Sequence, residues 1–278
     1  MTPDTLVIVG VGLIGGSVGL AARERGVARC IVGVGRSADT LAAAARAGCI
    51  DDGTTDLTVA ARGADLILVC TPVDRIVDHV RSAAAVCRPG TLLTDAGSTK
   101  DTIVRALDGT LPPGVPFVGG HPLAGSEKRG PEHARADLFV DRLVILTPTV
   151  QTDTEAVEHI GAFWRSLGAR VLHLLPQDHD DALAVTSHLP HLVAAAVANT
   201  LPQHLKSLTA TGFRDTTRVA GGDPDLWAAI FAQNRGAVLA ALGRLEQRLT
   251  DYRQAIEIDD MTTLRRLLAE AKAVRDNL

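Results

Sequence analysis

A glycine-rich turn follows the first apolar run of the chain and constrains the fold more than any other feature. Residues 5–10 read TLVIVG, and glycines then recur at positions 12 and 15 at the start of a helical pattern. This strand–turn–helix order is typical of dinucleotide-binding folds, where the glycines permit a tight turn, close approach of a pyrophosphate and close helix–strand packing. The motif predicts a dinucleotide site formed by Gly10, Gly12, Leu13, Ile14 and Gly15.

Short apolar runs alternate with helical patterns up to about residue 175. Runs rich in valine, isoleucine and leucine occur at residues 30–35, 64–70, 90–97, 116–120, 141–148 and 169–175. This alternation predicts a parallel sheet covered by helices on both faces. Alanine- and leucine-rich helical patterns follow. We therefore predict an α/β chain, with a Rossmann-type doubly wound parallel sheet over residues 1–176 and an all-α dimerisation and substrate domain over residues 177–278.

Composition and charge narrow the class of protein. Hydrophobic residues make up 46% of the chain and the net charge is −4, without a long basic run, which argues against nucleic acid or an anionic membrane surface as the main partner. No uninterrupted apolar run approaches the roughly 18 residues of a membrane span. The four cysteines form no CxxC pair, and residues 1–10 do not resemble a signal peptide. We expect a soluble cytoplasmic protein.

The end of the second predicted strand bears on which dinucleotide binds. An NAD site usually carries an acidic residue there to hold the ribose 2′-hydroxyl, whereas this chain has Gly35, Arg36 and Ser37, and no carboxylate before Asp39. A glycine removes repulsion against a 2′-phosphate, which Arg36 and Ser37 could contact. The sequence favours NADP over NAD without excluding NAD.

Two further turns carry polar side chains to the same edge of the predicted sheet. Ser98 lies in LLTDAGSTK and His121 in VGGHPLAGSE, and both follow apolar runs. Ligands of doubly wound sheets bind at the carboxyl ends of the strands, so we expect both turns to face the dinucleotide. A histidine there, oriented by a nearby hydroxyl, is a suitable proton acceptor near neutral pH. Lys100 is expected to be exposed at a helix start.

The helical half holds two polar segments, SHLPH at residues 187–191 and GFRDTTRVAGGDPDLW at residues 212–227. The second is dense in arginine and aspartate, which suits the binding of small carboxylates. His188 and His191, near the acidic QDHDD run, could be metal ligands, but Pro190 lies between them and no third ligand follows at motif spacing. We predict no metal, and we interpret the acidic run at residues 177–181 as a helix N-terminus.

Taken in order, these motifs resemble those of the prephenate/arogenate dehydrogenases of tyrosine biosynthesis. The matching stretches are GVGLIGGS, CTPV, TDAGSTK, GGHPLAGSE, TSHLPH and FRDTTRVAGGDPDLW, and they span nearly the whole chain. The resemblance implies a dinucleotide-binding domain followed by a helical domain that builds a homodimer. It places the active site between those domains.

The resemblance also implies roles for individual residues. His121 would be the catalytic histidine that contacts the ring hydroxyl, and Ser98 would position His121 and the nicotinamide. Arg218 would bind a substrate carboxylate. The remaining expected contacts are His191, Ser126 and Glu127 for the substrate and Thr71, Pro72 and Ser98 for the cofactor.

The expected reaction is an oxidative decarboxylation. His121 would accept the hydroxyl proton while hydride passes to NAD(P)+, and loss of carbon dioxide would restore an aromatic ring, giving 4-hydroxyphenylpyruvate or tyrosine. The motifs do not distinguish prephenate from arogenate. A 4-amino-4-deoxyprephenate dehydrogenase of a secondary pathway and a non-catalytic dinucleotide sensor remain alternatives.

Overall fold

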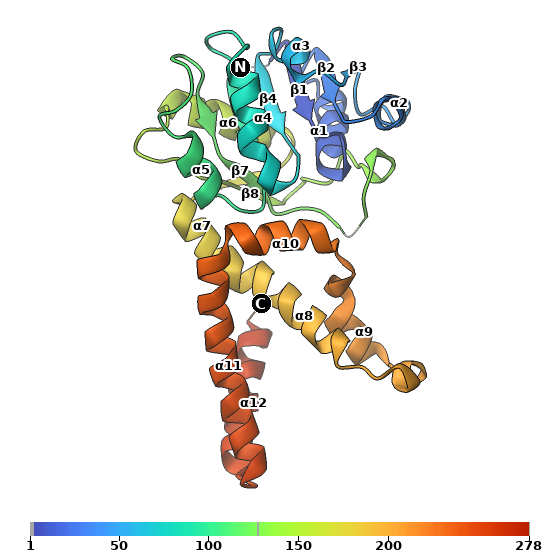
Figure 1. The fold of residues 1–278 in the computed structure, drawn as a ribbon, viewed down its shortest axis with the longest axis vertical. Helices are drawn as coiled ribbons and strands as arrows, with labels where there is room; N and C mark the ends of the chain where they lie inside the picture. Colours follow the sequence, from blue (N-terminus) through green and yellow to red (C-terminus); the bar gives the residue numbers. More distant parts are fainter. Residues whose placement is uncertain (1–2, 127, 278) are drawn as a thin grey trace. The chain divides into compact units, whose positions relative to one another are not determined.

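The computed structural model describes residues 3–126 and 128–277, and its strands form two sheets (Figure 1). The first sheet contains β1 (Thr5–Val9), β2 (Cys30–Val34), β3 (Asp52–Thr54), β4 (Leu66–Val69), β5 (Leu92–Asp95) and β6 (Phe117–Val118). The second contains β7 (Gly120–Pro122), β8 (Leu143–Leu146) and β9 (Arg170–His173). The first sheet is parallel throughout, with the order β3-β2-β1-β4-β5-β6. This is the usual order of a dinucleotide-binding doubly wound sheet, so the predicted fold class is confirmed.

Helices connect the strands of the sheet region. They are α1 (Leu13–Glu24), α2 (Ala38–Arg46), α3 (Leu57–Ala61), α4 (Val73–Ala84), α5 (Asp101–Leu107), the 3-10 turn η1 (Pro131–His133) and α6 (Thr154–Ser166). The later helices are α7 (Pro176–Leu183), the π-helical turn η2 (Ala184–His188), α8 (Leu189–Asn199), the 3-10 turn η3 (Gln203–Leu208), α9 (Thr211–Thr217), the 3-10 turn η4 (Arg218–Gly221), α10 (Pro224–Gln233), α11 (Arg235–Glu257) and α12 (Met261–Asp276). The predicted change from strands to helices after β9 is therefore present.

The structure differs from the sequence prediction at two strands. β3 and β7 are each three residues long, too short to give an alternation pattern in the sequence. β7 pairs antiparallel with β8, and β8 pairs parallel with β9, so the last two predicted strands belong to a separate mixed sheet. His121 consequently lies inside a strand and not in the turn that follows one.

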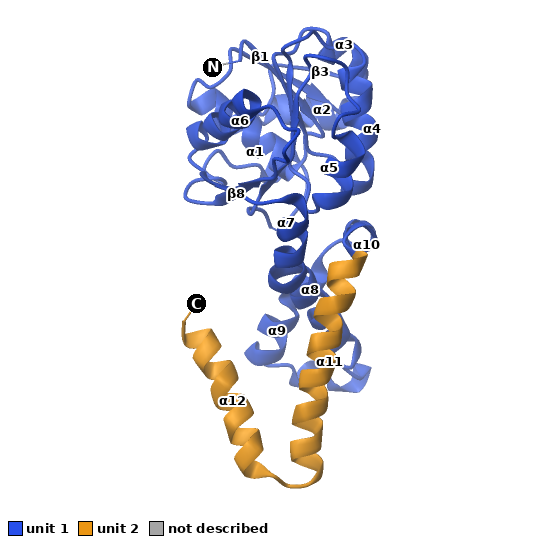
Figure 2. Ribbon diagram, turned by 90° about the vertical axis from the view of Figure 1, so that its left-hand side faces the viewer, with its two compact units in different colours: residues 1–234 blue, residues 235–278 orange. Residues whose placement is uncertain are grey.

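Two apolar clusters hold the six-stranded sheet between its helices. Leu6 and Ile8 of β1 belong to one cluster with side chains from α1 and α6, whereas Val7 and Val9 belong to the other with side chains from α4 and α5. Successive side chains of a strand point to opposite faces, which explains this division. Figure 2 shows α1 and α6 on one side of the sheet and α4 and α5 on the other. The sheet is covered on both faces, as predicted.

The chain divides into two compact units, residues 1–234 and residues 235–278, which Figure 2 shows in different colours. The first unit contains both sheets and the helices as far as α10. The second consists of α11 and α12, two helices joined by a short turn, in which the Tyr252 hydroxyl donates a 3.1 Å hydrogen bond to the Leu267 carbonyl. The predicted domain boundary at residues 176/177 falls where α7 begins.

The stretch α7–η2–α8, Pro176–Asn199, is an apolar helical segment that the sequence analysis did not predict to be so long. It is long and apolar enough, by length and composition alone, to cross a membrane, with a mean hydropathy of 1.2 over its best window. Yet His179 and Asp180 within it are buried, and Asp180 accepts backbone hydrogen bonds from the start of α5. Only 28% of that window is buried inside the chain, so packing within the chain accounts for part of its apolar composition.

Candidate active site

His121 is held at the carboxyl end of β5 by a buried network. Asp95, the last residue of β5, accepts a 3.0 Å hydrogen bond from the Gly120 amide, and the Lys100 ammonium donates a 2.9 Å bond to the Gly120 carbonyl. These contacts attach β7 to the edge of the sheet at which doubly wound folds bind their ligands. The backbone of His121 therefore has a defined position next to the predicted dinucleotide site.

Lys100 does not occupy the exposed position expected from the sequence. Its side chain is fully buried and forms an ion pair with Asp95. Burial lowers the pKa of Lys100, and the charge of Asp95 opposes that shift. A buried charge requires such pairing, because an unpaired one would be costly to remove from water. The lysine thus connects β5, the following turn and β7.

A chain of three side chains leads from His121 into the interior. Nδ1 of His121 lies 2.8 Å from Nε2 of His179, and Nδ1 of His179 lies 2.7 Å from Oδ1 of Asp180. Because a carboxylate only accepts, His179 donates from Nδ1, which leaves its Nε2 to accept the Nδ1–H of His121. The free lone pair of a neutral His121 is then on Nε2. The network selects the tautomer that can take up a proton from a ligand.

Asp180 has a different function from the one that the sequence suggested. We interpreted the acidic run as a helix N-terminus, and Asp178 does lie in the first turn of α7. Asp180, in contrast, is buried, and its carboxylate accepts the backbone N–H groups of Lys100 and Asp101 at 2.8 and 3.0 Å. It therefore caps α5 and at the same time orients His179.

Burial keeps the imidazoles of this network neutral. Loss of solvation is the largest cause that lowers the pKa of His121 well below its ordinary value, followed by the nearby His179, Lys100 and His188. Loss of solvation also lowers the pKa of His179, although its hydrogen bond to Asp180 opposes that shift. Near pH 7, His121 is consequently unprotonated and able to act as a base.

Ser98, the hydroxyl predicted to orient His121, is half-buried in the turn before α5. Within residues 3–126 and 128–277, its side chain makes no hydrogen bond, and His179 is the residue that orients the imidazole. The neighbouring Thr99 instead donates a 2.6 Å hydrogen bond to Gln233 of α10. The sequence analysis did not predict a role for His179, although this histidine lies in the QDHDD run that the analysis singled out.

A second group of rings lies beside this network. His191 is buried and stacks on Trp227, with ring centroids 3.5 Å apart and an interplanar angle of 13°. The edge of His188 meets the same indole, with centroids 6.1 Å apart. Gly222 packs so closely that an added Cβ would lie 2.5 Å from Trp227 Nε1. α8, α10 and the segment before α10 together form a compact aromatic wall.

The residues predicted to bind the substrate carboxylates are more exposed. Arg218 begins η4, and its side chain is exposed. Ser126 is also exposed, and its hydroxyl accepts a 3.2 Å hydrogen bond from the Lys128 amide. Glu127 lies outside the described residues. In the same segment, Arg129 pairs with Asp223, the N-cap of α10.

The glycine turn has the shape that a dinucleotide requires. Gly10 has a φ of +95°, and a Cβ there would lie 2.8 Å from the Cys70 carbonyl oxygen. A Cβ at Gly15 would lie 2.3 Å from the Gly10 oxygen, whereas a Cβ at Gly12 would meet nothing within 4 Å. The first and third glycines therefore permit close packing, and the second leaves open space at the N-terminus of α1. These residues fit a bound pyrophosphate.

Two other segments expected at the cofactor lie at carboxyl ends of strands. After β4, Thr71 is half-buried, with its hydroxyl 3.0 Å from Nδ1 of His79, and Pro72 is the N-cap of α4. After β2, Arg36 and Ser37 are exposed, and the Ser37 hydroxyl caps α2 by accepting from the Thr40 amide at 3.3 Å. Both segments are thus at the sheet edge that the motif predicts.

The part of the chain that the structure describes contains no candidate metal site. Among residues 3–126 and 128–277, no group of three or more histidine, cysteine, aspartate and glutamate side chains could hold a metal ion.

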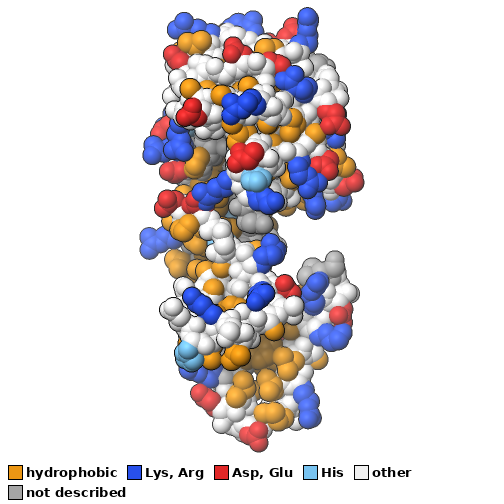
Figure 3. Space-filling view, turned by 90° about the vertical axis from the view of Figure 1, so that its right-hand side faces the viewer, with side chains coloured by type: hydrophobic (Ala, Val, Ile, Leu, Met, Phe, Trp, Pro, Cys, Tyr) orange, Lys and Arg blue, Asp and Glu red, His pale blue; other side chains and the backbone are white. Residues whose placement is uncertain are grey.

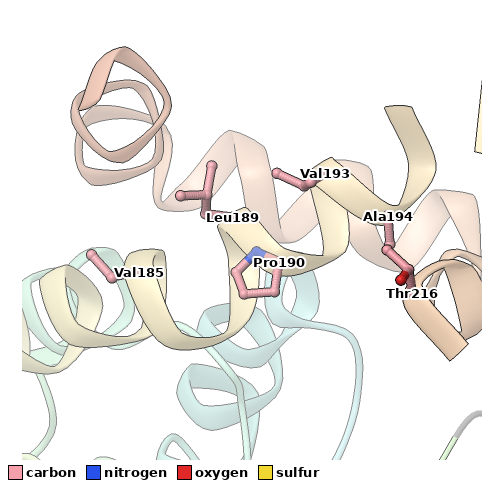
Figure 4. Close-up of a pocket in the computed structure, with 6 residues that line it drawn as sticks. All are labelled: Val185, Leu189, Pro190, Val193, Ala194 and Thr216. Atoms are coloured by element: carbon pink, nitrogen blue, oxygen red, sulfur yellow. The ribbon is translucent and has the colours of Figure 1, made fainter. Parts of the chain in front are cut away.

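An apolar depression in the helical part of the chain has a volume of about 340 Å³. Figure 4 shows its lining residues, which are Val185, Leu189, Pro190, Val193, Ala194 and Thr216. None of the site histidines lines this depression, although Leu189 and Pro190 lie between His188 and His191 in the chain.

Two protein-family models match this chain and together cover most of it. The nucleotide-binding domain of prephenate dehydrogenase matches residues 18–173, and the dimerization domain of prephenate dehydrogenase matches residues 175–270. This chain belongs to the prephenate dehydrogenase family. The family resemblance stated from the motifs is therefore confirmed. As a prephenate dehydrogenase family member, the chain has Lys100 and His121 in its first matched part, and the glycine turn lies just before that part. Its second matched part holds His179, His188, His191 and Arg218.

Individual relatives match over almost the whole chain. Prephenate dehydrogenase from Bacillus subtilis is 34% identical over 99% of this chain and 76% of its own length. A solved prephenate dehydrogenase from A. aeolicus, in complex with hydroxyphenyl propionate and NAD+, is 32% identical, with a TM-score of 0.93 and coverage of 99% and 98%. Synechocystis arogenate dehydrogenase is 32% identical, with a TM-score of 0.81 and coverage of 98% and 99%.

Proposed function

We propose that this chain is a prephenate/arogenate (cyclohexadienyl) dehydrogenase that works with an NAD(P)+ cofactor. The observation that carries the proposal is the His121–His179–Asp180 network, which presents an unprotonated nitrogen at the carboxyl end of β5 in a chain of this family. Its substrates bear a hydroxyl on the ring carbon that loses hydride and a carboxylate across the ring. A neutral imidazole fits the first of these groups.

In the proposed reaction, Nε2 of His121 accepts the hydroxyl proton while the ring carbon becomes a carbonyl. The bound dinucleotide supplies the hydride acceptor. Carbon dioxide then leaves, the electron pair of the broken bond enters the ring, and the proton on His121 returns to the phenolate oxygen. The products are carbon dioxide, the reduced cofactor, and 4-hydroxyphenylpyruvate from prephenate or tyrosine from arogenate. His179 remains a hydrogen-bond acceptor for Nδ1 throughout and stabilises the transient imidazolium.

The other site residues receive roles in the same proposal. Ser98, which the resemblance gives the role of positioning His121 and the nicotinamide, keeps the nicotinamide part of that role because His179 orients His121. Arg218 binds the side-chain carboxylate, because its charge and planar donors suit such a group and its exposure leaves it free to reach a ligand. The remaining substrate contacts are His191, Ser126 and Glu127. Thr71 and Pro72 contact the cofactor.

We propose NADP as the preferred cofactor. Gly35, Arg36 and Ser37 offer no carboxylate to a ribose 2′-hydroxyl, and Arg36 makes no ion pair with another described residue. A 2′-phosphate would meet this guanidinium and the exposed N-terminus of α2. The relative from A. aeolicus was solved with NAD+, so NAD remains the second cofactor to be measured.

We also propose a cytoplasmic homodimer, with residues 1–176 as the nucleotide-binding domain and residues 177–278 as the dimerisation and substrate domain. The matched dimerization-domain family supports this assembly. Large apolar side chains are exposed on the later helices, including Leu239, Leu249, Ile256, Leu268 and Val274. Figure 3 shows apolar surface over the helical part of the chain. A second copy would cover such surface, and the depression of Figure 4 fits the same role.

Steady-state kinetics with both substrates and both cofactors tests the function. We expect production of reduced cofactor with prephenate or arogenate, together with one equivalent of carbon dioxide. Turnover of 4-amino-4-deoxyprephenate alone would favour a secondary-pathway enzyme. Cofactor binding without turnover of any of the three compounds would favour a dinucleotide sensor and overturn the proposal.

A further inference from the structure

His188 carries a buried hydrogen-bond donor for which the described part of the chain provides no partner. The residue is 1% exposed and ends the π-helical turn η2, just before Leu189 and Pro190. Its Nε2 is buried and makes no hydrogen bond. Buried polar groups are nearly always paired, so an unpaired one calls for an explanation. π-Turns are frequent at functional sites, which makes a ligand contact a reasonable explanation here.

The protonation of His188 follows from its neighbour Asn234. Nδ2 of Asn234 lies 2.7 Å from the Asp180 carbonyl oxygen, which only accepts, so this atom is the amide nitrogen and not the amide oxygen. The same nitrogen lies 3.1 Å from Nδ1 of His188 and donates to it. A neutral His188 therefore carries its proton on Nε2. Burial lowers the pKa of His188 to about 4, which keeps the ring neutral near pH 7.

The position of His188 relates this donor to the proposed reaction. His188 lies near enough to His121 that a charge on it would lower the pKa of His121, and the nearby His179 lowers the pKa of His188 in the same way. Its ring also meets the edge of Trp227, on which His191 stacks. His188 is thus close both to the proton-accepting network and to the aromatic wall, the two parts of the proposed site that would contact a substrate ring.

We propose that His188 is a substrate-specificity residue whose Nε2–H binds the ring carboxylate, the group that leaves as carbon dioxide. This inference rests on the proposed function. The carboxylate lies across the ring from the hydroxyl that His121 contacts, so a donor beside the His121 network but separate from it fits this group.

The charge of His188 suits a leaving carboxylate. As carbon dioxide forms, negative charge moves from the carboxylate into the ring. A cationic partner would bind the carboxylate more strongly before the reaction than during it and would therefore oppose its loss. A neutral N–H donor orients the group with less of this penalty. Arg218, which is always charged, suits the side-chain carboxylate that persists in the product.

The test uses a pair of ligands that differ at the proposed contact. Prephenate and arogenate carry the ring carboxylate, whereas their products 4-hydroxyphenylpyruvate and tyrosine lack it but keep the side chain. His188→Asn retains an acceptor near the position of Nδ1 for Asn234 and deletes the Nε2 donor. His188→Gln places an amide N–H near the position of Nε2. Both variants are measured in the full-length protein.

We expect His188→Asn to raise the KM for the preferred substrate by about 10- to 100-fold, the range for a lost hydrogen bond to a charged group. The Kd of the matching aromatic product, measured by calorimetry with oxidised cofactor present, should change by less than about 3-fold. His188→Gln should recover most of the loss. Thermal denaturation of each variant shows whether it is folded.

Trp164→Phe is the matched control, because Trp164 Nε1 is another buried donor without a hydrogen bond and lies in the core beside Phe139 and Phe163. It should leave both affinities unchanged. Equal weakening of substrate and product by His188→Asn would overturn the inference, as would no change in either. Turnover by the wild-type protein is measured first, so that a failure of the proposed function is recognised separately.

Discussion

The proton-accepting residues of the proposed site and its carboxylate-binding residues differ in burial and in hydrogen bonding. His121, His179 and Asp180 are buried and hydrogen-bonded to one another, whereas Arg218 and Ser126 are exposed. A buried neutral imidazole must find its partners within the protein, so folding itself fixes the tautomer of His121. An exposed guanidinium is solvated by water and is free to pair with a ligand. Variants on the first side should therefore change kcat, and variants on the second should change KM.

The largest effect is expected for His121→Asn. The amide cannot accept the hydroxyl proton, so kcat should fall by roughly 10²-fold or more, while KM changes much less. Steady-state kinetics measures both, and a fluorescence titration of the reduced cofactor checks that its affinity is unchanged. His173→Asn, an exposed histidine on β9, is the matched control and should retain wild-type rates. A kcat within a few-fold of wild type for His121→Asn would show that the histidine is not the base.

Arg218→Ala should have a smaller effect than His121→Asn, and it should change KM more than kcat. Loss of a charge-assisted hydrogen bond to the side-chain carboxylate should raise KM by about 30-fold or more and change kcat less. Arg214→Ala removes an exposed arginine four residues earlier, in α9, and is the control for a general loss of positive charge. If both variants raise KM equally, the segment acts by net charge. If Arg218→Ala lowers kcat alone, the comparison between the two sides is wrong.

Gly35→Asp should shift the cofactor preference toward NAD by about 10-fold. The new carboxylate would accept from the ribose 2′-hydroxyl and repel a 2′-phosphate. Its Cβ would lie 3.1 Å from Leu41 Cδ2, so the leucine side chain must adjust slightly. Gly35→Ala introduces the same Cβ without the charge and isolates this packing change. The ratio of kcat/KM for NADP and NAD is the measurement, and a strong NAD preference in the wild type would contradict our interpretation of this loop.

Sequence reasoning located the dinucleotide fold because its signals are local. The Gly10–Gly15 turn between a strand and a helix, and the apolar runs of the buried strands, each depend on residues close together in the chain. The strand order and both covered faces follow from that pattern. β7 was missed because three residues show no periodicity, and its pairing with β8 depends on residues more than 20 positions away.

The side chains that complete the site could not be inferred in this way. Asp180 looked like an ordinary helix-start acid, and only the folded chain shows that it receives the backbone of Lys100 and orients His179. Lys100 looked exposed because it precedes a helix, yet the buried Asp95 pairs with it. Contacts between residues about 60 to 80 positions apart leave no spacing signal in one sequence.

The tautomer and charge of His121 are the central claim, and nitrogen NMR of the histidine side chains measures both directly. Long-range ¹H–¹⁵N spectra of ¹⁵N-histidine-labelled protein distinguish Nδ1–H, Nε2–H and doubly protonated rings, and the signals lost in His121→Asn assign this residue. Because burial lowers the pKa of His121 well below 6.5, we predict a neutral ring with its proton on Nδ1 throughout pH 6 to 8. In kinetics, kcat/KM should then show no loss attributable to His121 as the pH falls from 7.5 to 6. A His121 that titrates near pH 6.5, or that carries its neutral proton on Nε2, would contradict the account.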